Sequence, residues 1–182
     1  MKNIKKLLIV AVSVSGAFAA GTALAADGNI SFQGLVNTSP CAISPASQNM
    51  TVNMGSWNTD SFTAQGSTTA ASKFTIDLLR CSADRTANVR FDGIADADGN
   101  LRIGAGEVIS SVARGIAIQL QDSSGTAIQV GADSGNYAVL RGDNQLQFQA
   151  AYIQTAENPA AGGSAVTAGT ANATAQFTVA YN

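Results

Sequence analysis

Apolar and polar residues alternate in several short stretches, and this alternation dominates the pattern of the chain after its first 25 residues. A period of two is typical of strands with one buried face, because successive side chains point to opposite sides of a sheet. The alternating apolar positions lie within residues 28–36, 74–78, 89–91, 116–120, 146–152 and 173–181.

Residue types that favour turns separate these stretches, as at 98–100, 124–125, 133–136 and 142–144. No long segment carries a convincing helical stripe, although residues 59–72 leave room for a turn or two of helix. The pattern therefore predicts an all-β sandwich in one domain.

Residues 1–25 have the features of a secretory signal peptide. Three lysines precede an apolar run over residues 7–20, and Ala23-Leu24-Ala25 fits a small-residue cleavage site. A transmembrane anchor is the alternative, but serines and glycines dilute the run below the density of a membrane span. We therefore expect export, with a mature chain that begins at Ala26.

Cys41 and Cys81 are the two cysteines of the chain, and export places them in an oxidising compartment where disulfides persist. We expect them to bond to each other, and closing a loop of about 40 residues stabilises a fold by roughly 4 kcal/mol in the chain-entropy model. A pair of free or redox-active thiols is the alternative, although the spacing is unlike a C-x-x-C motif.

Composition excludes several classes of function. Charged residues make up 12% of the chain, which carries a net charge of −2 and has no histidine. Histidine-based catalysis and histidine-ligated metals are excluded, and a nucleic-acid surface would need clustered Lys and Arg. We therefore expect no nucleic-acid partner, no cofactor and no small-molecule substrate.

The acidic residues near position 96 invite two further hypotheses. Asp96, Asp98, Asn100 and Glu107 have the spacing of a calcium loop, but Leu101 stands where such a loop needs glycine. A secreted hydrolase could use the aspartates, yet no apolar residues enclose them as a tuned acid–base pair requires. We therefore expect a polar turn, no metal and no enzyme.

Motifs along the whole mature chain identify a family in combination. An alternating start, Gly28-x-Ile30-x-Phe32-x-Gly34-x-Val36, precedes Cys41-Ala42-Ile43, and Cys81 follows the stretch 74–79. Residues 115–120 lead to Asp122 and Gly125, Tyr181 is penultimate, and Gly169 is the fourteenth residue from the end. With these motifs the chain resembles the structural pilins of the chaperone–usher pathway, most of all the major subunits of type 1 fimbriae. Met54-Gly55 departs conservatively from the Leu-Gly of many relatives.

The resemblance implies an incomplete immunoglobulin-like sandwich, completed by a donor strand from a neighbouring subunit or a chaperone. Pilins are a known example of such strand addition. The chain would comprise a signal peptide (1–25), an N-terminal extension that donates the strand (26–38) and the pilin domain (39–182). The donor residues would be Gly28, Ile30, Phe32, Gly34 and Val36. The residues of the acceptor groove and of chaperone binding would be Gly169, Ala173, Ala175, Phe177, Val179, Tyr181 and Asn182, with the terminal carboxylate of Asn182 docked on basic residues of the chaperone.

The function that this implies is a shaft subunit of a surface fimbria that polymerises head to tail and serves cell adhesion. Its partners would be identical or related subunits, a periplasmic chaperone and an outer-membrane usher, on a route through the periplasm to the cell surface. A minor or adaptor pilin of the same system stays open. So does a self-contained exported ligand-binding domain, in which residues 28–36 are an ordinary first strand of a complete sandwich.

Overall fold

The structure is a computed structural model that describes residues 31, 34, 36, 39–160 and 163–182. The chain divides into two units, Met1–Asn37 and Thr38–Asn182, and every helix and strand of the described residues belongs to the second. The predicted signal peptide and three of the predicted donor residues, Gly28, Ile30 and Phe32, lie outside the described residues.

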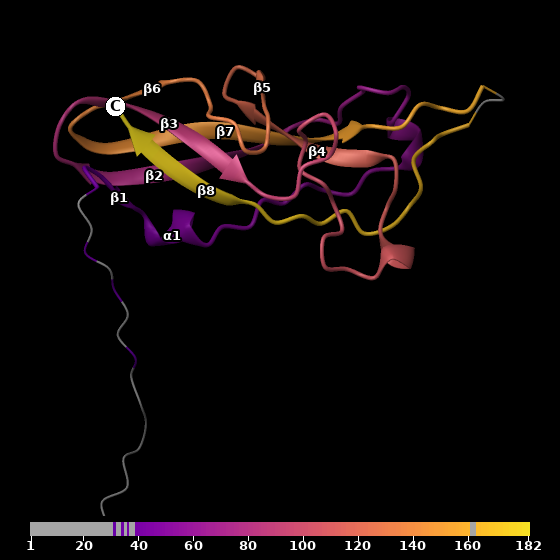
Figure 1. The fold of residues 1–182 in the computed structure, drawn as a ribbon, viewed down its shortest axis with the longest axis horizontal. Helices are drawn as coiled ribbons and strands as arrows, with labels where there is room; N and C mark the ends of the chain where they lie inside the picture. Colours follow the sequence, from indigo (N-terminus) through magenta and orange to yellow (C-terminus); the bar gives the residue numbers. More distant parts are fainter. Residues whose placement is uncertain (1–30, 32–33, 35, 37–38, 161–162) are drawn as a thin grey trace, which may run out of the picture. The chain divides into compact units, whose positions relative to one another are not determined.

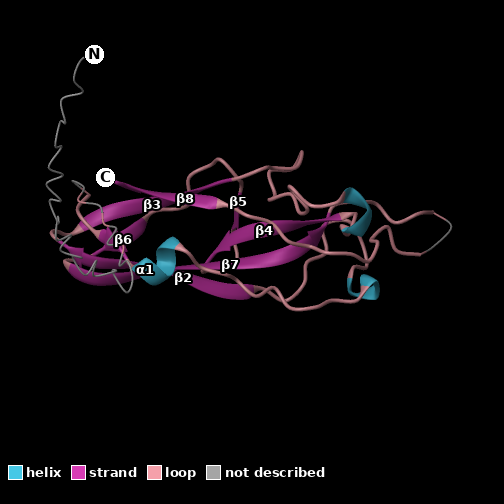
Figure 2. Cartoon of the chain, turned by 90° about the horizontal axis from the view of Figure 1, so that it is seen from below, coloured by secondary structure: helices cyan, strands magenta, loops and turns pink. Residues whose placement is uncertain are grey.

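Two antiparallel sheets form the domain (Figure 1). The five-stranded sheet has the order β1 (Ala42–Ile43), β2 (Ser72–Cys81), β7 (Gly142–Gln154), β4 (Ile116–Asp122) and β5 (Ala127–Ile128). The three-stranded sheet has the order β6 (Tyr137–Val139), β3 (Arg85–Asp92) and β8 (Gln176–Tyr181). Figure 2 shows β3 and β8 in one layer and β2 and β7 in the other. The helices are short: α1 (Pro45–Gln48), η1 (Thr59–Ser61) and η2 (Ile109–Ser111).

The predicted all-β architecture is confirmed, and four of the alternating stretches fall within β2, β3, β4 and β7. In β7 the period of two is plain, because Leu146 and Phe148 are buried whereas Gln145 and Gln147 are exposed. Buried apolar faces of this kind supply most of the free energy that holds two sheets together.

Two local predictions differ from the structure. The last strand begins at Gln176 and not at Ala173. Residues 142–144, expected as a turn, are the start of β7, where Asn144 pairs with Leu78. The polar side chains at this point satisfy neighbouring backbone groups, since Asp143 accepts from the Arg80 amide at 2.8 Å. Turn-forming residue types therefore mark the reversal but not its position.

Aromatic rings fill the centre of the sandwich. The Phe148 ring lies 5.1 Å from Phe91, 5.3 Å from Tyr137 and 5.7 Å from Phe74, measured between ring centroids. Because these residues come from both sheets, the rings tie the two layers together. A disulfide joins Cys41 to Cys81, the pair that we expected, and fixes the start of the domain to the end of β2.

Among the described residues, no helix is long and apolar enough to cross a membrane.

Candidate functional site

Among the described strands, β8 pairs with β3 on one edge and with no strand on the other. The amides of Thr86 and Asn182 each donate to the other residue's carbonyl, at 3.3 and 2.8 Å. In an antiparallel pair such hydrogen-bonded positions alternate along the strand, so the backbones of Thr178 and Ala180 also face β3. The backbone groups that face the open edge are those of Phe177, Val179 and Tyr181.

The side chains of these same three residues point between the two layers but are only half-buried. On the neighbouring strand β3, by contrast, Val89 is 0% exposed and Phe91 is 4% exposed. Inward-facing residues of a complete sandwich are normally enclosed, so the core beside β8 is open. Burial raises the pKa of the Tyr181 hydroxyl, and a hydrogen bond with Ser39 offsets part of this shift.

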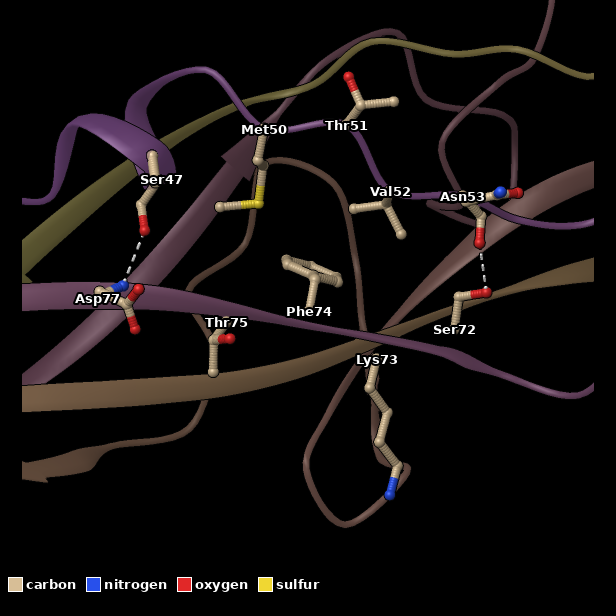
Figure 3. Close-up of a pocket in the computed structure, with 11 residues that line it drawn as sticks. Ser47, Met50, Thr51, Val52, Asn53, Ser72, Lys73, Phe74, Thr75 and Asp77 are labelled. Carbon is tan, nitrogen blue, oxygen red and sulfur yellow. Dashed lines mark hydrogen bonds between the residues drawn. The ribbon is translucent and has the colours of Figure 1, made fainter.

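A second unpaired edge lies across from β8, in the segment Met50–Gly55, which we call the facing segment. Its residues alternate in burial: Met50, Val52 and Met54 are half-buried, and the residues between them are exposed. Figure 3 shows Met50 and Val52 pointing toward Phe74 of β2, while Thr51 points away. The segment thus has the side-chain pattern of a strand.

The backbone of the facing segment forms no hydrogen bond to another backbone group among the described residues. Side chains hold it in place instead: Ser72 donates to the Asn53 carbonyl at 2.8 Å, and Trp57 donates to the Met54 carbonyl at 2.8 Å (Figure 3 shows the first). An extended segment with free backbone groups can accept a further strand.

A groove of about 640 Å³ lies between the facing segment and the chain that leads into β8. Its floor is apolar and comes from both sheets: Phe74, Ile76, Phe91, Leu101, Ile118, Leu120, Ala150 and Tyr152. Its second wall is residues 171–175 with Phe177. The Tyr152 hydroxyl donates to the Ala171 carbonyl at 2.8 Å, which fixes this wall to the floor. The site is therefore an apolar trough with an unpaired backbone edge on each side.

Three of the residues expected at an acceptor groove, Ala173, Ala175 and Phe177, line this groove. Val179 and Tyr181 continue the inward face of β8 beyond the groove lining, and Asn182 is exposed at the end of β8. Of the expected donor residues, Gly34 and Val36 are described, and both are exposed. The facing segment was missed, although the alternation of Met50, Val52 and Met54 could have revealed it.

Gly169 lies where two backbones nearly touch. A Cβ atom at this position would stand 2.4 Å from the Ala113 nitrogen and 2.5 Å from the Val112 carbonyl carbon. Glycine is the residue that permits such close approach. Gly169 therefore sets the path of the chain just before the groove wall.

A smaller hollow of about 420 Å³ adjoins the facing segment, between α1 and the outer edge of β2 (Figure 3). Ser47 accepts from the Asp77 amide at 2.9 Å at one end of it. Figure 3 shows Lys73 directed away from Phe74. The hollow is open and has a mixed polar and apolar lining, and it marks where the chain leaves the edge of β2 to become the facing segment.

The aspartates near position 96 organise their own loop. The Asp96 carboxylate accepts from the amides of Asp98 at 2.9 Å and of Asn100 at 2.8 Å. Asp92 pairs with Arg90 at 2.8 Å. No group of three or more acidic or cysteine side chains suited to a metal occurs among the described residues. These hydrogen bonds give the carboxylates a structural role in the turn.

Comparisons with known proteins agree with this architecture. A family model described as fimbrial protein matches residues 30–182. The type-1 fimbrial protein A chain of Salmonella typhi is 36% identical over 97% of this chain and 99% of its own length. The probable major fimbrial subunit LpfA of Escherichia coli O157:H7 is 32% identical over 91% of both chains.

Solved structures show the same fold. A type I fimbria protein and antigen of Burkholderia pseudomallei is 38% identical, with a TM-score of 0.57 over 80% of this chain and 91% of that one. The P pilus rod subunit PapA is 22% identical, with a TM-score of 0.61 over 79% of this chain and 100% of that one.

Proposed function

Since the chain belongs to the fimbrial protein family, whose members are structural subunits of surface fimbriae, we propose that it builds a fimbrial shaft by donating residues 26–38 to the groove of a neighbouring copy. The observation that carries this proposal is the apolar groove between two unpaired backbone edges. A single extended strand can satisfy both edges and fill the trough between them.

The N-terminal extension has the chemistry of such a strand. Ile30, Phe32, Gly34 and Val36 stand at alternate positions, so their side chains would share one face of an extended segment. Burying each of the three large apolar side chains is worth about 1.5–3 kcal/mol. Val36 is 99% exposed in the single chain, so its side chain is available for burial in a groove. A long side chain at position 34 would obstruct the face that carries the apolar residues. The backbone pairs at the two edges add to this stabilisation.

The position of the domain's first residues indicates the direction of the donor. Cys41 is bonded to Cys81, and the last residue, Asn182, pairs with Thr86 just after that cysteine. Figure 1 shows the C-terminus and β1 at the same end of the domain, which we call the C-terminal pole. Each extension therefore leaves its domain at the pole where β8 ends.

If the donor runs antiparallel to β8, its first residues lie at the C-terminal pole of the accepting domain and its last residues emerge at the opposite end of the groove. The next domain then follows with its own groove free, and the contact repeats as an open filament. A parallel donor would bring the C-terminal poles of the donating and accepting copies together. The accepting copy's own extension already leaves its domain at that pole. We therefore infer the antiparallel direction.

The remaining partners follow from the family. A periplasmic chaperone would occupy the groove before polymerisation and bind the terminal carboxylate of Asn182, and an outer-membrane usher would export the subunit. The subunit is not an enzyme on this proposal, and the filament serves cell adhesion. Gly169, Val179 and Tyr181 would support the acceptor groove, and residues 1–25 would be the signal peptide.

Thermal unfolding of residues 39–182 with and without a synthetic peptide of residues 26–38 tests the proposal. A ligand at one hundred times its Kd adds about 2.7 kcal/mol, which corresponds to a rise in Tm of roughly 5–10 °C for a domain of this size. The Gly34→Arg peptide is the matched control, and we expect it to give no rise. A truncated domain that is already stable and ignores both peptides would indicate a complete sandwich and a self-contained binding domain.

A further inference from the structure

Val108 and Ile109 form an exposed apolar pair in the loop that joins the acidic turn to β4. Their exposed fractions are 72% and 76%. A single exposed apolar residue is ordinary in a folded protein. Two adjacent branched aliphatic side chains at the tip of one loop expose more apolar surface, and such patches mark contacts with partners.

The loop that carries the pair is firmly braced against the groove wall. The carboxylate of Glu107, the residue before Val108, accepts from the hydroxyl of Thr170 and, at 2.9 Å, from the side-chain amide of Asn172. The Gly104 amide donates to the Asn172 carbonyl at 2.8 Å. Since Asn172 lines the groove, the apolar pair stands directly beside the groove's far end.

The occupant of this surface follows from the antiparallel donor, so the inference rests on the proposed function. A donor that emerges at the far end continues from Val36 to Cys41 of its own domain in five residues. Five extended residues span at most about 17 Å. The C-terminal pole of the donating copy must therefore lie close to Val108 and Ile109 of the accepting copy.

The C-terminal pole presents a matching apolar residue. Leu140 is 62% exposed in the turn between β6 and β7. Asn144 fixes this turn, because its side chain accepts from the Leu140 amide at 2.9 Å and donates to the Leu140 carbonyl at 2.7 Å. The same amide group lies 3.5 Å from the Cys81 sulfur. One side chain thus links the Leu140 turn to the disulfide from which the extension departs.

We propose that Val108 and Ile109 of each accepting copy pack against the Leu140 turn of the copy that donates its strand. This contact adds a second point of attachment to the joint. A joint held by an extended strand alone leaves the angle between successive domains free, whereas two points of attachment fix it. The apolar pair therefore makes the filament stiff.

Cross-linking of assembled filaments of the mature chain tests the contact. The variant that combines Ile109→Cys with Leu140→Cys is treated with a short bismaleimide. Subunits that are not covalently linked are then separated by boiling in detergent. We expect a ladder of covalent multimers. Each single variant should give none, and neither should Ile109→Cys combined with Ala127→Cys, since Ala127 is exposed on the short edge strand β5. Filaments that form normally but give no ladder would overturn the contact.

A second measurement does not depend on introduced cysteines. The double variant Val108→Ser with Ile109→Ser should still polymerise, but its filaments should have a shorter persistence length in electron micrographs. Leu140→Ser should shorten it equally, and the combination should add nothing further, as for residues in direct contact. An unchanged persistence length would refute the inference. Failure of the wild-type chain to polymerise, or of the 26–38 peptide to bind, would instead refute the proposed function.

Discussion

Replacing Gly169 by alanine perturbs a close approach of two backbone segments just before the groove wall. The added Cβ atom would meet three backbone atoms, at 2.4 Å from the Ala113 nitrogen, 2.5 Å from the Val112 carbonyl carbon and 2.7 Å from the Ser111 oxygen. Ordinary contacts of a Cβ atom begin near 3.4 Å. The backbone at Gly169 or the backbone of residues 111–113 must therefore move by about 1 Å, which is more than side-chain repacking can absorb.

The cost can be worked from the bonds that such a movement strains. Thr170 donates its amide to the Ser111 carbonyl at 2.7 Å and accepts from the Ala113 amide at 2.9 Å. Each hydrogen bond contributes about 0.5–1.5 kcal/mol, and overpacking a tight site costs about 1–3 kcal/mol. The smaller entropy of the unfolded alanine chain returns about 0.4–1 kcal/mol. We expect a net loss of about 2–3 kcal/mol, which lowers Tm by roughly 5–10 °C.

The matched control is Gly135→Ala, since a Cβ atom at Gly135 meets nothing within 4 Å and its backbone lies outside the left-handed region, as does that of Gly169. Its stability should rise by at most about 0.4–1 kcal/mol, the gain from the smaller entropy of the unfolded alanine chain. Both variants of residues 39–182 are unfolded thermally by circular dichroism with the 26–38 peptide in excess. A Gly169→Ala domain as stable as the Gly135→Ala domain would refute the reasoning from close backbone approach.

Three further predictions concern the core, the disulfide and pH. Phe148→Ala removes a ring that is 1% exposed and should cost about 3–5 kcal/mol in urea unfolding. The control Gln147→Ala shortens an exposed side chain and should show no such loss. Replacing Cys41 and Cys81 together by alanine should cost about 2–5 kcal/mol, and an unchanged urea midpoint would contradict it. Hydrogen bonds from Ser124 and Thr126 hold the pKa of Asp122 below its ordinary value of 3.8, so their stabilisation is present above that pH and is lost as pH falls through the lowered pKa. Asp122→Asn should therefore be less stable than the wild type at pH 7, and the two urea midpoints should converge in acid; a constant difference would contradict this.

Strands with one buried face were predictable from the sequence because their side chains carry the period of the sheet. Leu146, Phe148, Ala150 and Tyr152 mark β7 without ambiguity. Strands β5 and β6 contain two and three residues, too few for any period to repeat. Helix α1 depends on local chemistry instead, with Ser44 accepting from the Ser47 amide at 3.1 Å and proline in the first turn.

The candidate site was predictable on one wall and not on the other. The alternation of Phe177, Val179 and Tyr181 continues a pattern along a strand, so it could be read directly. The facing segment has the same alternation at Met50, Val52 and Met54, but no sequence signal says that its backbone lacks a partner. An unpaired edge is a property of the whole topology, since it depends on which strands stand next to one another.

Amide hydrogen exchange along β8 tests the central claim most directly. Thr178 and Ala180 face β3 and serve as internal standards, whereas Phe177, Val179 and Tyr181 face the open edge. In a complex of residues 39–182 with the 26–38 peptide, we predict that the amides of Phe177, Val179 and Tyr181 become as protected as those of the standards, while the Gly34→Arg peptide leaves them exposed. Edge amides that still exchange at unpaired rates in the peptide complex would contradict strand donation at this groove.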